Sequence, residues 1–220
     1  MLSVKNKIIA GYVVLIAILV AGSLVSSRSS SEQIDAVQEL MGEDMPILMS
    51  AQDISLAALE MRRHEKDVLL GAGDQAKQRD ALDKMTSASD AALSKLKGLA
   101  AQVAADRELG ESDKRTAASA HESLARYVAF AGSVTREAAV AGADPAKANE
   151  RLASGKQDFY EFEKAMAAIR DIAGRMVAAR AKEMAEMSAT VKNVQMAALV
   201  GGVAAGILSA LAVVLAVTRP

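Results

Sequence analysis

Two long apolar stretches near the ends of the chain constrain its fold more than any other feature of the sequence. The first covers residues 8–25 and the second residues 196–217. A helix of about 20 residues, rising about 1.5 Å per residue, crosses the hydrocarbon core of a membrane, which is about 30 Å thick. The sequence between the stretches is rich in charge and contains no third one. We therefore expect two transmembrane helices that flank one extramembrane domain, residues 26–195, with both termini on the same side of the membrane.

Positive charges next to the apolar stretches predict their orientation. Lys5 and Lys7 precede the first stretch and Arg219 follows the second, whereas Arg28 is the only positive charge at the opposite edge of the first. Cytoplasmic flanks of membrane spans are enriched in lysine and arginine. Both ends of the chain are therefore predicted to be cytoplasmic, and the domain between the spans external.

A cleaved signal peptide is the alternative interpretation of the first stretch. Small residues at positions 21–23 follow the apolar run, as they do at a cleavage site. The run is long, however, and helical apolar spacing continues beyond it through Ile34 and Val37. These two features favour a membrane span.

Composition narrows the fold class. Alanine and other helix-forming residues dominate, aromatic residues make up only 3% of the chain, and alternating β-branched runs typical of strands are missing. The chain has no cysteine, which excludes disulfides and thiol chemistry. A net charge of −1 gives no electrostatic basis for nucleic-acid binding. We expect an all-α membrane protein without a nucleic-acid partner.

Three groups of helix-breaking residues divide the extramembrane domain into four helices. Residues 71–74 (Gly-Ala-Gly-Asp) end one helix and cap the next. Residues 106–112 separate the second helix from the third, with Ser112 as the expected N-cap. At residues 141–145, Asp144 is the expected cap and Pro145 the first helical residue. Because these connections are short, neighbouring helices should be antiparallel.

Apolar residues recur with a period of about 3.5 in all four helices. The expected core positions are Leu40, Ile47, Ile54, Met61 and Val68; Leu82, Met85, Ser89, Ala92, Leu96, Leu99 and Val103; Ala117, Ala120, Leu124, Tyr127, Ala131, Val134 and Ala138; and Ala148, Leu152, Phe159, Phe162, Met166, Ile169, Ala173 and Met176. This period predicts an up-down four-helix bundle whose first and fourth helices continue into the membrane spans. Pro46 should kink the first helix without ending it, because the pattern resumes in phase afterwards.

This arrangement resembles the sensory half of a methyl-accepting chemotaxis receptor. A short start (residues 1–7), a span, a four-helix domain and a second span follow each other as in that family, and residues 61–70 (MRRHEKDVLL) resemble the arginine-bearing end of the first helix of its ligand-binding domain. Pro220 resembles the proline that opens the HAMP signalling module, so residues 218–220 would be the start of that module. The resemblance implies a receptor fragment that lacks the rest of HAMP and the kinase-coupling region.

The resemblance also implies a location, partners and a mode of action. The chain would lie in a bacterial inner membrane as a homodimer with a periplasmic sensor domain. It would bind a periplasmic solute or a solute-loaded binding protein, use no cofactor, and reach cytoplasmic kinase-coupling partners only through the missing C-terminal half. Two alternatives remain open: the same sensor on a histidine kinase or nucleotide cyclase, and a purely structural membrane-anchored bundle.

Charged residues on the inner face of the first helix are the candidate site. Arg62 and Glu65 both point toward the expected core, where charges need partners. They are either an internal ion pair or, for Arg62 together with Arg63 and Lys66, part of an anion site that fits a carboxylate ligand. In the chemotaxis receptors that this chain resembles, arginines near the distal end of the first helix bind ligand carboxylates at the dimer interface.

Register places aromatic residues of the fourth helix at the same height. If the first and fourth helices are antiparallel, Arg62 is level with Phe159, Tyr160 and Phe162. The two phenylalanines fall in the apolar seam and are expected in the core. Tyr160 lies off the seam, so it is the fourth candidate ligand-binding residue.

No catalytic constellation is visible in the sequence. The only histidines, His64 and His121, should lie about 20 Å apart along the helix axes, too far apart to share a metal ion within one subunit. Glycine-rich phosphate loops and clusters of carboxylates are also missing. We expect a protein that is not an enzyme and holds no metal.

Overall fold

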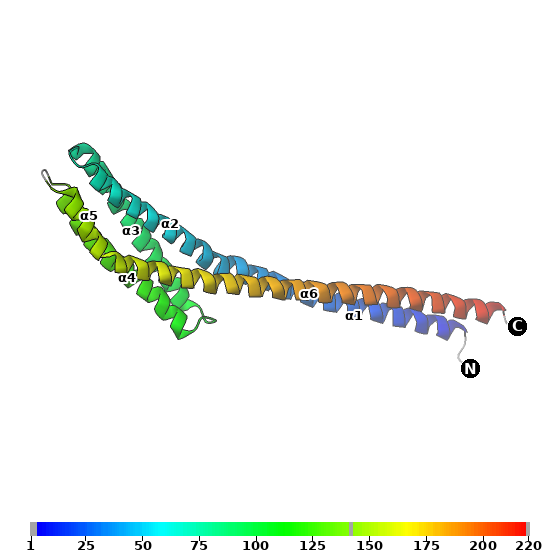
Figure 1. The fold of residues 1–220 in the computed structure, drawn as a ribbon. Coiled ribbons are helices and arrows are strands. Elements are labelled where there is room, and N and C mark those ends of the chain that lie inside the picture. Colours follow the sequence, from blue (N-terminus) through cyan, green and yellow to red (C-terminus); the bar gives the residue numbers. More distant parts are fainter. Residues whose placement is uncertain (1–3, 141–142, 219–220) are drawn as a thin grey trace. The chain divides into compact units, whose positions relative to one another are not determined.

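The computed structural model describes residues 4–140 and 143–218, and every regular element among them is a helix. The expected all-α class is confirmed. The helices are α1 (Val4–Glu39), a π-helical turn η1 (Leu40–Asp44), α2 (Met45–Leu70), α3 (Gln75–Ala105), α4 (Glu111–Ala138), α5 (Pro145–Ser154) and α6 (Lys156–Thr218) (Figure 1).

The chain forms two compact units. One comprises Met41–Val177, and the other combines α1 with the part of α6 that begins at Ala178. The first unit is shorter than the extramembrane segment expected from the sequence, because the residues of α1 and α6 next to the apolar stretches belong to the second.

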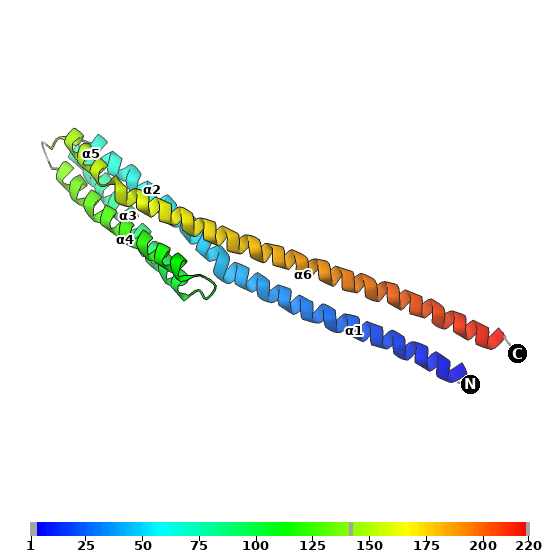
Figure 2. The same ribbon diagram turned by 60° about the horizontal axis from the view of Figure 1, so that its bottom comes forward.

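Helices α2, α3, α4, α5 and the first turns of α6 lie next to one another within Met41–Val177 (Figure 2). Their buried side chains form one hydrophobic core. The apolar positions expected from the 3.5-residue period are buried in α3, α4 and α6, with the exceptions of Leu82 and Met176, which are half-buried. In α2, Ile47, Ile54, Met61 and Val68 are buried as expected, whereas Leu40, in η1, is half-buried. Alanine occupies many of these positions, which allows the helices to approach closely.

Capping residues fix most of the helix ends where the sequence indicated. The Asp74 carboxylate accepts a hydrogen bond from the Lys77 amide (3.2 Å), and Gly71 closes α2. The Asp144 carboxylate accepts from the Ala146 amide (2.9 Å), with Pro145 at the start of α5. Residues 141 and 142 of this predicted break lie outside the described residues.

The cap predicted at Ser112 is wrong. Helix α4 begins two residues earlier than that cap implies, at Glu111, with Gly110 as its N-cap. The Asp113 carboxylate accepts a hydrogen bond from the Gly110 amide (3.3 Å), so an acidic residue in the first turn replaces the expected hydroxyl cap.

The fourth helix of the expected bundle consists of two helices. Helix α5 ends at Ser154, and α6 begins at Lys156 after a break at Gly155. A Cβ at position 155 would lie 2.2 Å from the ring of Phe130 on α4, so the aromatic ring packs directly on bare backbone. This close approach leaves no room for a side chain at position 155, and glycine, a weak helix former, ends α5 there although the apolar pattern continues across it.

Pro46 distorts the helical turn that precedes it. A proline has no amide hydrogen and its ring clashes with the carbonyl four residues earlier, here Gly42. That carbonyl lies in the π-helical turn η1, which widens the helix immediately before Pro46. The predicted continuity through Pro46 is confirmed, and the distortion takes the form of a π-helical turn.

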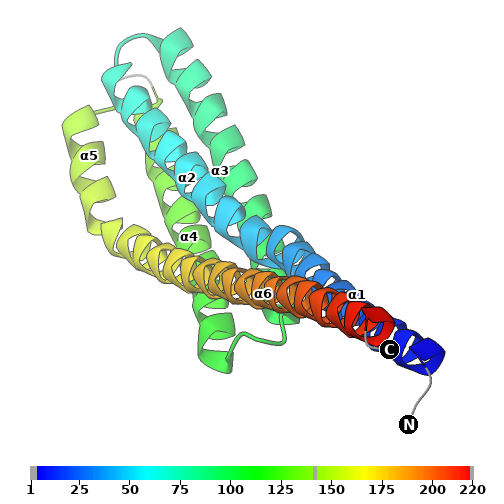
Figure 3. The same cartoon turned by 90° about the vertical axis from the view of Figure 1, so that its right-hand side faces the viewer.

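In the second unit, α1 and α6 run side by side, with the start of α1 and the end of α6 at the same end (Figure 3). Gly22 allows close approach, since a Cβ there would lie 3.2 Å from the Ala198 side chain. The Gln195 amide donates to the Ser26 hydroxyl (3.2 Å), and Arg180 pairs with Glu39 (2.9 Å).

Among the described residues, one helix, α6, is long and apolar enough to cross a membrane, by length and composition alone. Large apolar side chains of α1 are also exposed along the first predicted span, including Ile16, Leu19 and Leu24.

Candidate functional site

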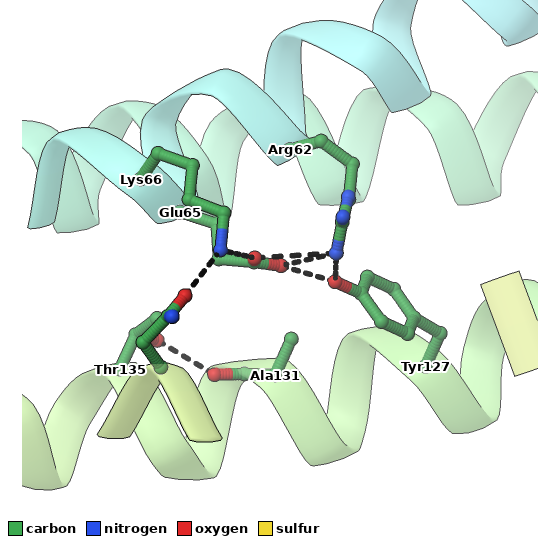
Figure 4. A network of polar contacts seen from close by, with 7 residues as sticks. Arg62, Glu65, Lys66, Tyr127, Ala131 and Thr135 are labelled. Carbon is green, nitrogen blue, oxygen red and sulfur yellow. Dashed lines mark hydrogen bonds and ion pairs between the residues drawn. The ribbon is translucent and has the colours of Figure 1, made fainter. Parts of the chain in front are cut away.

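A polar network lies inside the bundle where α2 faces α4. The Glu65 side chain is 0% exposed and that of Arg62 is 20% exposed. The Arg62 guanidinium donates through Nη1 to both carboxylate oxygens of Glu65, at 3.2 and 3.3 Å, and to the hydroxyl of Tyr127 on α4. The Tyr127 hydroxyl donates in turn to Glu65. Figure 4 shows these side chains directed toward one another.

A second cation and an aromatic cluster complete the network. Lys66 Nζ lies 3.6 Å from the Glu65 carboxylate and donates to the side-chain carbonyl of Asn149 on α5 (2.8 Å). The Arg62 guanidinium also stacks over the rings of Phe159 (5.0 Å) and Tyr127 (5.4 Å). Cation–π contacts of this kind are worth about 0.5–2 kcal/mol. Residues of α2, α4, α5 and α6 thus meet around one buried carboxylate.

The network shifts the protonation of its members. Burial alone would lower the pKa of Arg62, but the hydrogen bond to Tyr127 and the charge of Glu65 outweigh burial and raise this pKa. Burial, together with the hydrogen bond to Glu65, raises the pKa of Tyr127 well above its usual value. The arginine is therefore held charged and the tyrosine neutral.

This geometry favours the internal ion pair over the anion site for Arg62. The negative charge that a bound carboxylate would bring is already supplied by Glu65. A buried carboxylate with an arginine, a lysine and a phenol around it satisfies its hydrogen-bonding capacity within the fold. The network can hold α2, α4 and α5 in register.

The structure brings two of the four candidate ligand-binding residues together. Arg62 and Lys66 share Glu65, whereas Arg63 lines a separate pocket between α2 and α3. That pocket has a volume of about 350 Å³ and also contains His64, Asp67, Leu70, Gly71, Lys77, Asp80, Ala81 and Lys84. Tyr160 is 54% exposed on α6 and lies near enough to Arg62 to contribute to its raised pKa.

The predicted register between the first and last helices is confirmed at this height. Arg62 lies against Phe159, which is buried together with Phe162. From the sequence, Tyr127 was predicted only as a core position, and Asn149 was not identified. A hydroxyl-bearing residue in a seam otherwise filled by alanine, leucine and valine was the available signal for Tyr127, because a buried hydroxyl needs a partner.

The two histidines were considered as metal ligands in the sequence. His64 pairs with Asp67 on the same helix (Nδ1 to Oδ2, 3.2 Å). Within the described residues, no group of three or more metal-ligating side chains gathers.

Comparison with protein families, with characterised proteins and with solved structures finds no match for this chain.

Proposed function

We propose that this chain is the sensory part of a transmembrane receptor of the chemotaxis type. Its bundle binds an extracytoplasmic solute and passes a displacement of α6 to a cytoplasmic output module. The observation that carries the proposal is the continuity of α6, whose 63 residues supply core side chains at one end and an apolar stretch at the other. A displacement of α6 within the bundle is passed along the same helix to its apolar stretch.

Exposed apolar residues at the far ends of both long helices support a membrane location. On α6, Leu199, Val203 and Leu208 are more than half exposed, as are Ile16 and Leu19 on α1. Water would disfavour this much exposed apolar surface, whereas lipid favours it. We therefore propose that two spans anchor an up-down bundle. The positive-inside rule favours an external position for that bundle, and the resemblance to chemotaxis receptors implies a bacterial periplasm.

A row of exposed side chains on α2 supports a homodimer. Met49, Leu56 and Leu59 are exposed at spacings of seven and three residues, on a helix whose opposite face is buried in the bundle. This spacing is typical of a helix that packs along a second helix.

A disulfide-trapping experiment tests signal transmission. The chain has no cysteine, so Ser26→Cys with Gln195→Cys introduces a single reactive pair between α1 and α6, where the native side chains are 3.2 Å apart. The full chain in membranes is exposed to amino acids, organic acids and other solutes, and the rate of disulfide formation is measured. A ligand that displaces α6 changes this rate because it binds one position of α6 more tightly than the other.

A matched pair within the bundle provides the control. Asp53 and Lys95 join α2 and α3 by a 3.5 Å ion pair, and neither residue belongs to α6. Disulfide formation between Asp53→Cys and Lys95→Cys should not respond to the ligand. If no solute changes the rate of disulfide formation between positions 26 and 195, the bundle is better described as a structural membrane anchor. The network around Glu65, whose hydrogen-bond partners all belong to the fold, favours this alternative.

Labelling of introduced cysteines tests the orientation. Ser112→Cys should react with a membrane-impermeant reagent in intact cells, and Ser3→Cys should not. Protection of position 112 together with labelling of position 3 would reverse the proposed topology.

A further inference from the structure

A small cavity between α2 and α6 lies beside the polar network and is not occupied by it. Its volume is about 140 Å³. It is lined by Ser55, Leu59, Phe159, Phe162, Glu163 and Arg170. We propose that this cavity binds a small carboxylate with an apolar body, and that Arg170 receives the carboxylate. The inference rests on the proposed sensory function and names its ligand class.

Arg170 has an uncompensated charge at the cavity wall. Its Nη1 donates to the Ser55 hydroxyl, which itself donates to the Ala51 carbonyl (2.9 Å). Across the part of the chain that the structure describes, Ser55 is the one hydrogen-bond partner of this guanidinium, and no carboxylate lies within ion-pair distance of it. A guanidinium has five N–H donors, and it binds a carboxylate through two parallel hydrogen bonds. Arg170 is only half-buried, so an incoming anion can reach the remaining donors.

The rest of the cavity suits an apolar body. Phe159 and Phe162 are buried, and their ring centroids lie 5.7 Å apart. The ring of Tyr127 packs against Phe159, with a distance of 5.1 Å between the ring centroids. Leu59 forms an exposed rim. A cavity of about 150 Å³ lined by apolar side chains holds a molecule of the size of benzene, so the space here fits a phenyl or branched aliphatic group.

Glu163 restricts the ligand class further. It lies seven residues before Arg170, on the same face of α6 and about 10 Å away along the axis. Its negative charge repels a second carboxylate on the ligand and attracts an ammonium group. The cavity should therefore prefer monocarboxylates and amino acids with apolar side chains over dicarboxylates.

The position of the cavity links it to signalling. Ser55 and Leu59 come from α2, and the other lining residues come from α6, the helix that continues into the apolar stretch. An occupant contacts both helices at once. Its binding energy can therefore bias the position of α6 relative to α2, to the extent that it binds one position more tightly.

Binding of defined probes to the full chain in lipid nanodiscs tests the inference. Phenylalanine, leucine, phenylacetate and isovalerate represent apolar carboxylates with and without an ammonium group, and succinate represents dicarboxylates. We expect at least one of the first four to bind, measured by saturation-transfer NMR and calorimetry, and succinate not to bind. Arg170→Gln should weaken binding about tenfold or more, because a charge-assisted hydrogen-bonded pair is lost.

Three further variants make the test specific. Arg63→Gln removes an arginine from the separate pocket between α2 and α3 and should leave the affinity unchanged. Leu59→Trp enlarges a side chain at the rim and should block entry without disturbing the core. Because Leu59 also belongs to the proposed dimer face, the oligomeric state of this variant is measured together with its affinity. Glu163→Gln should allow succinate to bind. Circular dichroism of each variant establishes that the helices remain formed.

The outcomes separate this inference from the proposed function. Failure of all four apolar probes to bind, or unchanged binding in Arg170→Gln, overturns the inference. If a ligand shifts the Ser26–Gln195 cross-linking rate and its binding depends on Arg63 instead, the sensory function stands and the cavity is not its site. If a probe binds through Arg170 without changing the cross-linking rate, the cavity is supported and the sensory function is contradicted.

Discussion

Arg62 and Arg170 are two arginines of the same bundle in opposite surroundings. Arg62 donates to a fully buried carboxylate and a buried phenol, and stacks over two aromatic rings. Arg170 donates to one serine hydroxyl at the edge of a cavity. A guanidinium whose partners all belong to the fold contributes to the structure, whereas one with spare donors beside an apolar cavity is available to a ligand. The residue type is the same, and only the partners decide the role.

The largest effect should come from the centre of the Arg62 network. Glu65→Ala leaves Arg62 without its counter-charge and Tyr127 without its acceptor, and removing one partner of a buried pair costs about 3–5 kcal/mol. Native-state hydrogen exchange of the core amides measures the free energy of unfolding of the bundle. Asp67→Ala, which breaks a partly exposed pair with His64, should cost less than about 1 kcal/mol. Equal losses in the two variants would refute the structural role of Glu65.

The buried helix faces could be predicted from the sequence better than the site. Burial follows the spacing of apolar residues within one helix, whereas the site depends on contacts between helices. A 3.5-residue period determines which face of each helix is buried, so Met85, Leu124 and Met166 were identified as core without any tertiary knowledge. The break at Gly155 was missed because the apolar pattern continues across it from Leu152 to Phe159, and a single glycine inside a helical pattern does not always end a helix.

The roles of the charged residues needed the partners as well. Arg62 and Glu65 were recognised as a pair or a site, but only the position of Tyr127 decides between these possibilities. Arg170 was not singled out, because it and Ser55 lie on different helices and only their contact across α2 and α6 shows that they line one cavity.

The next effect concerns the hydroxyl that joins α4 to the network. Tyr127→Phe keeps the ring and removes the hydrogen bonds to Arg62 and Glu65. Hydrogen bonds to charged groups contribute about 1.5–3 kcal/mol, so we expect a loss in that range, measured in the same way. A loss below about 0.5 kcal/mol, smaller than an ordinary neutral hydrogen bond contributes, would show that the phenol is not a functional link in the network.

The pH dependence of stability follows from Tyr127. Its pKa in the folded protein is raised above the unfolded value of about 10 by burial and by Glu65, so folding favours the neutral phenol. This contribution to stability is complete below about pH 10 and is lost as the pH rises from there through the folded-state pKa. Stability of the native chain should therefore fall more steeply above pH 10 than that of Tyr127→Phe. Parallel curves for the two proteins would contradict a buried neutral tyrosine.

The smallest effect should come from the outer cation of the network. Lys66 is 40% exposed and lies 3.6 Å from Glu65, so Lys66→Met should change the free energy of unfolding by no more than about 1 kcal/mol. A loss comparable with that of Glu65→Ala would make Lys66, and not Arg62, the main counter-charge of the buried carboxylate.

The comparison of Arg62→Gln with Arg170→Gln tests the division of roles most directly. Both changes remove one guanidinium from the same bundle, and native-state hydrogen exchange reports the free energy of unfolding for each. Arg62→Gln should destabilise the bundle by about 3–5 kcal/mol, because Glu65 remains buried, and Arg170→Gln by less than about 1 kcal/mol, because no buried charge is left behind. Equal losses, or a larger loss for Arg170→Gln, would contradict the assignment of Arg62 to the fold and Arg170 to the ligand.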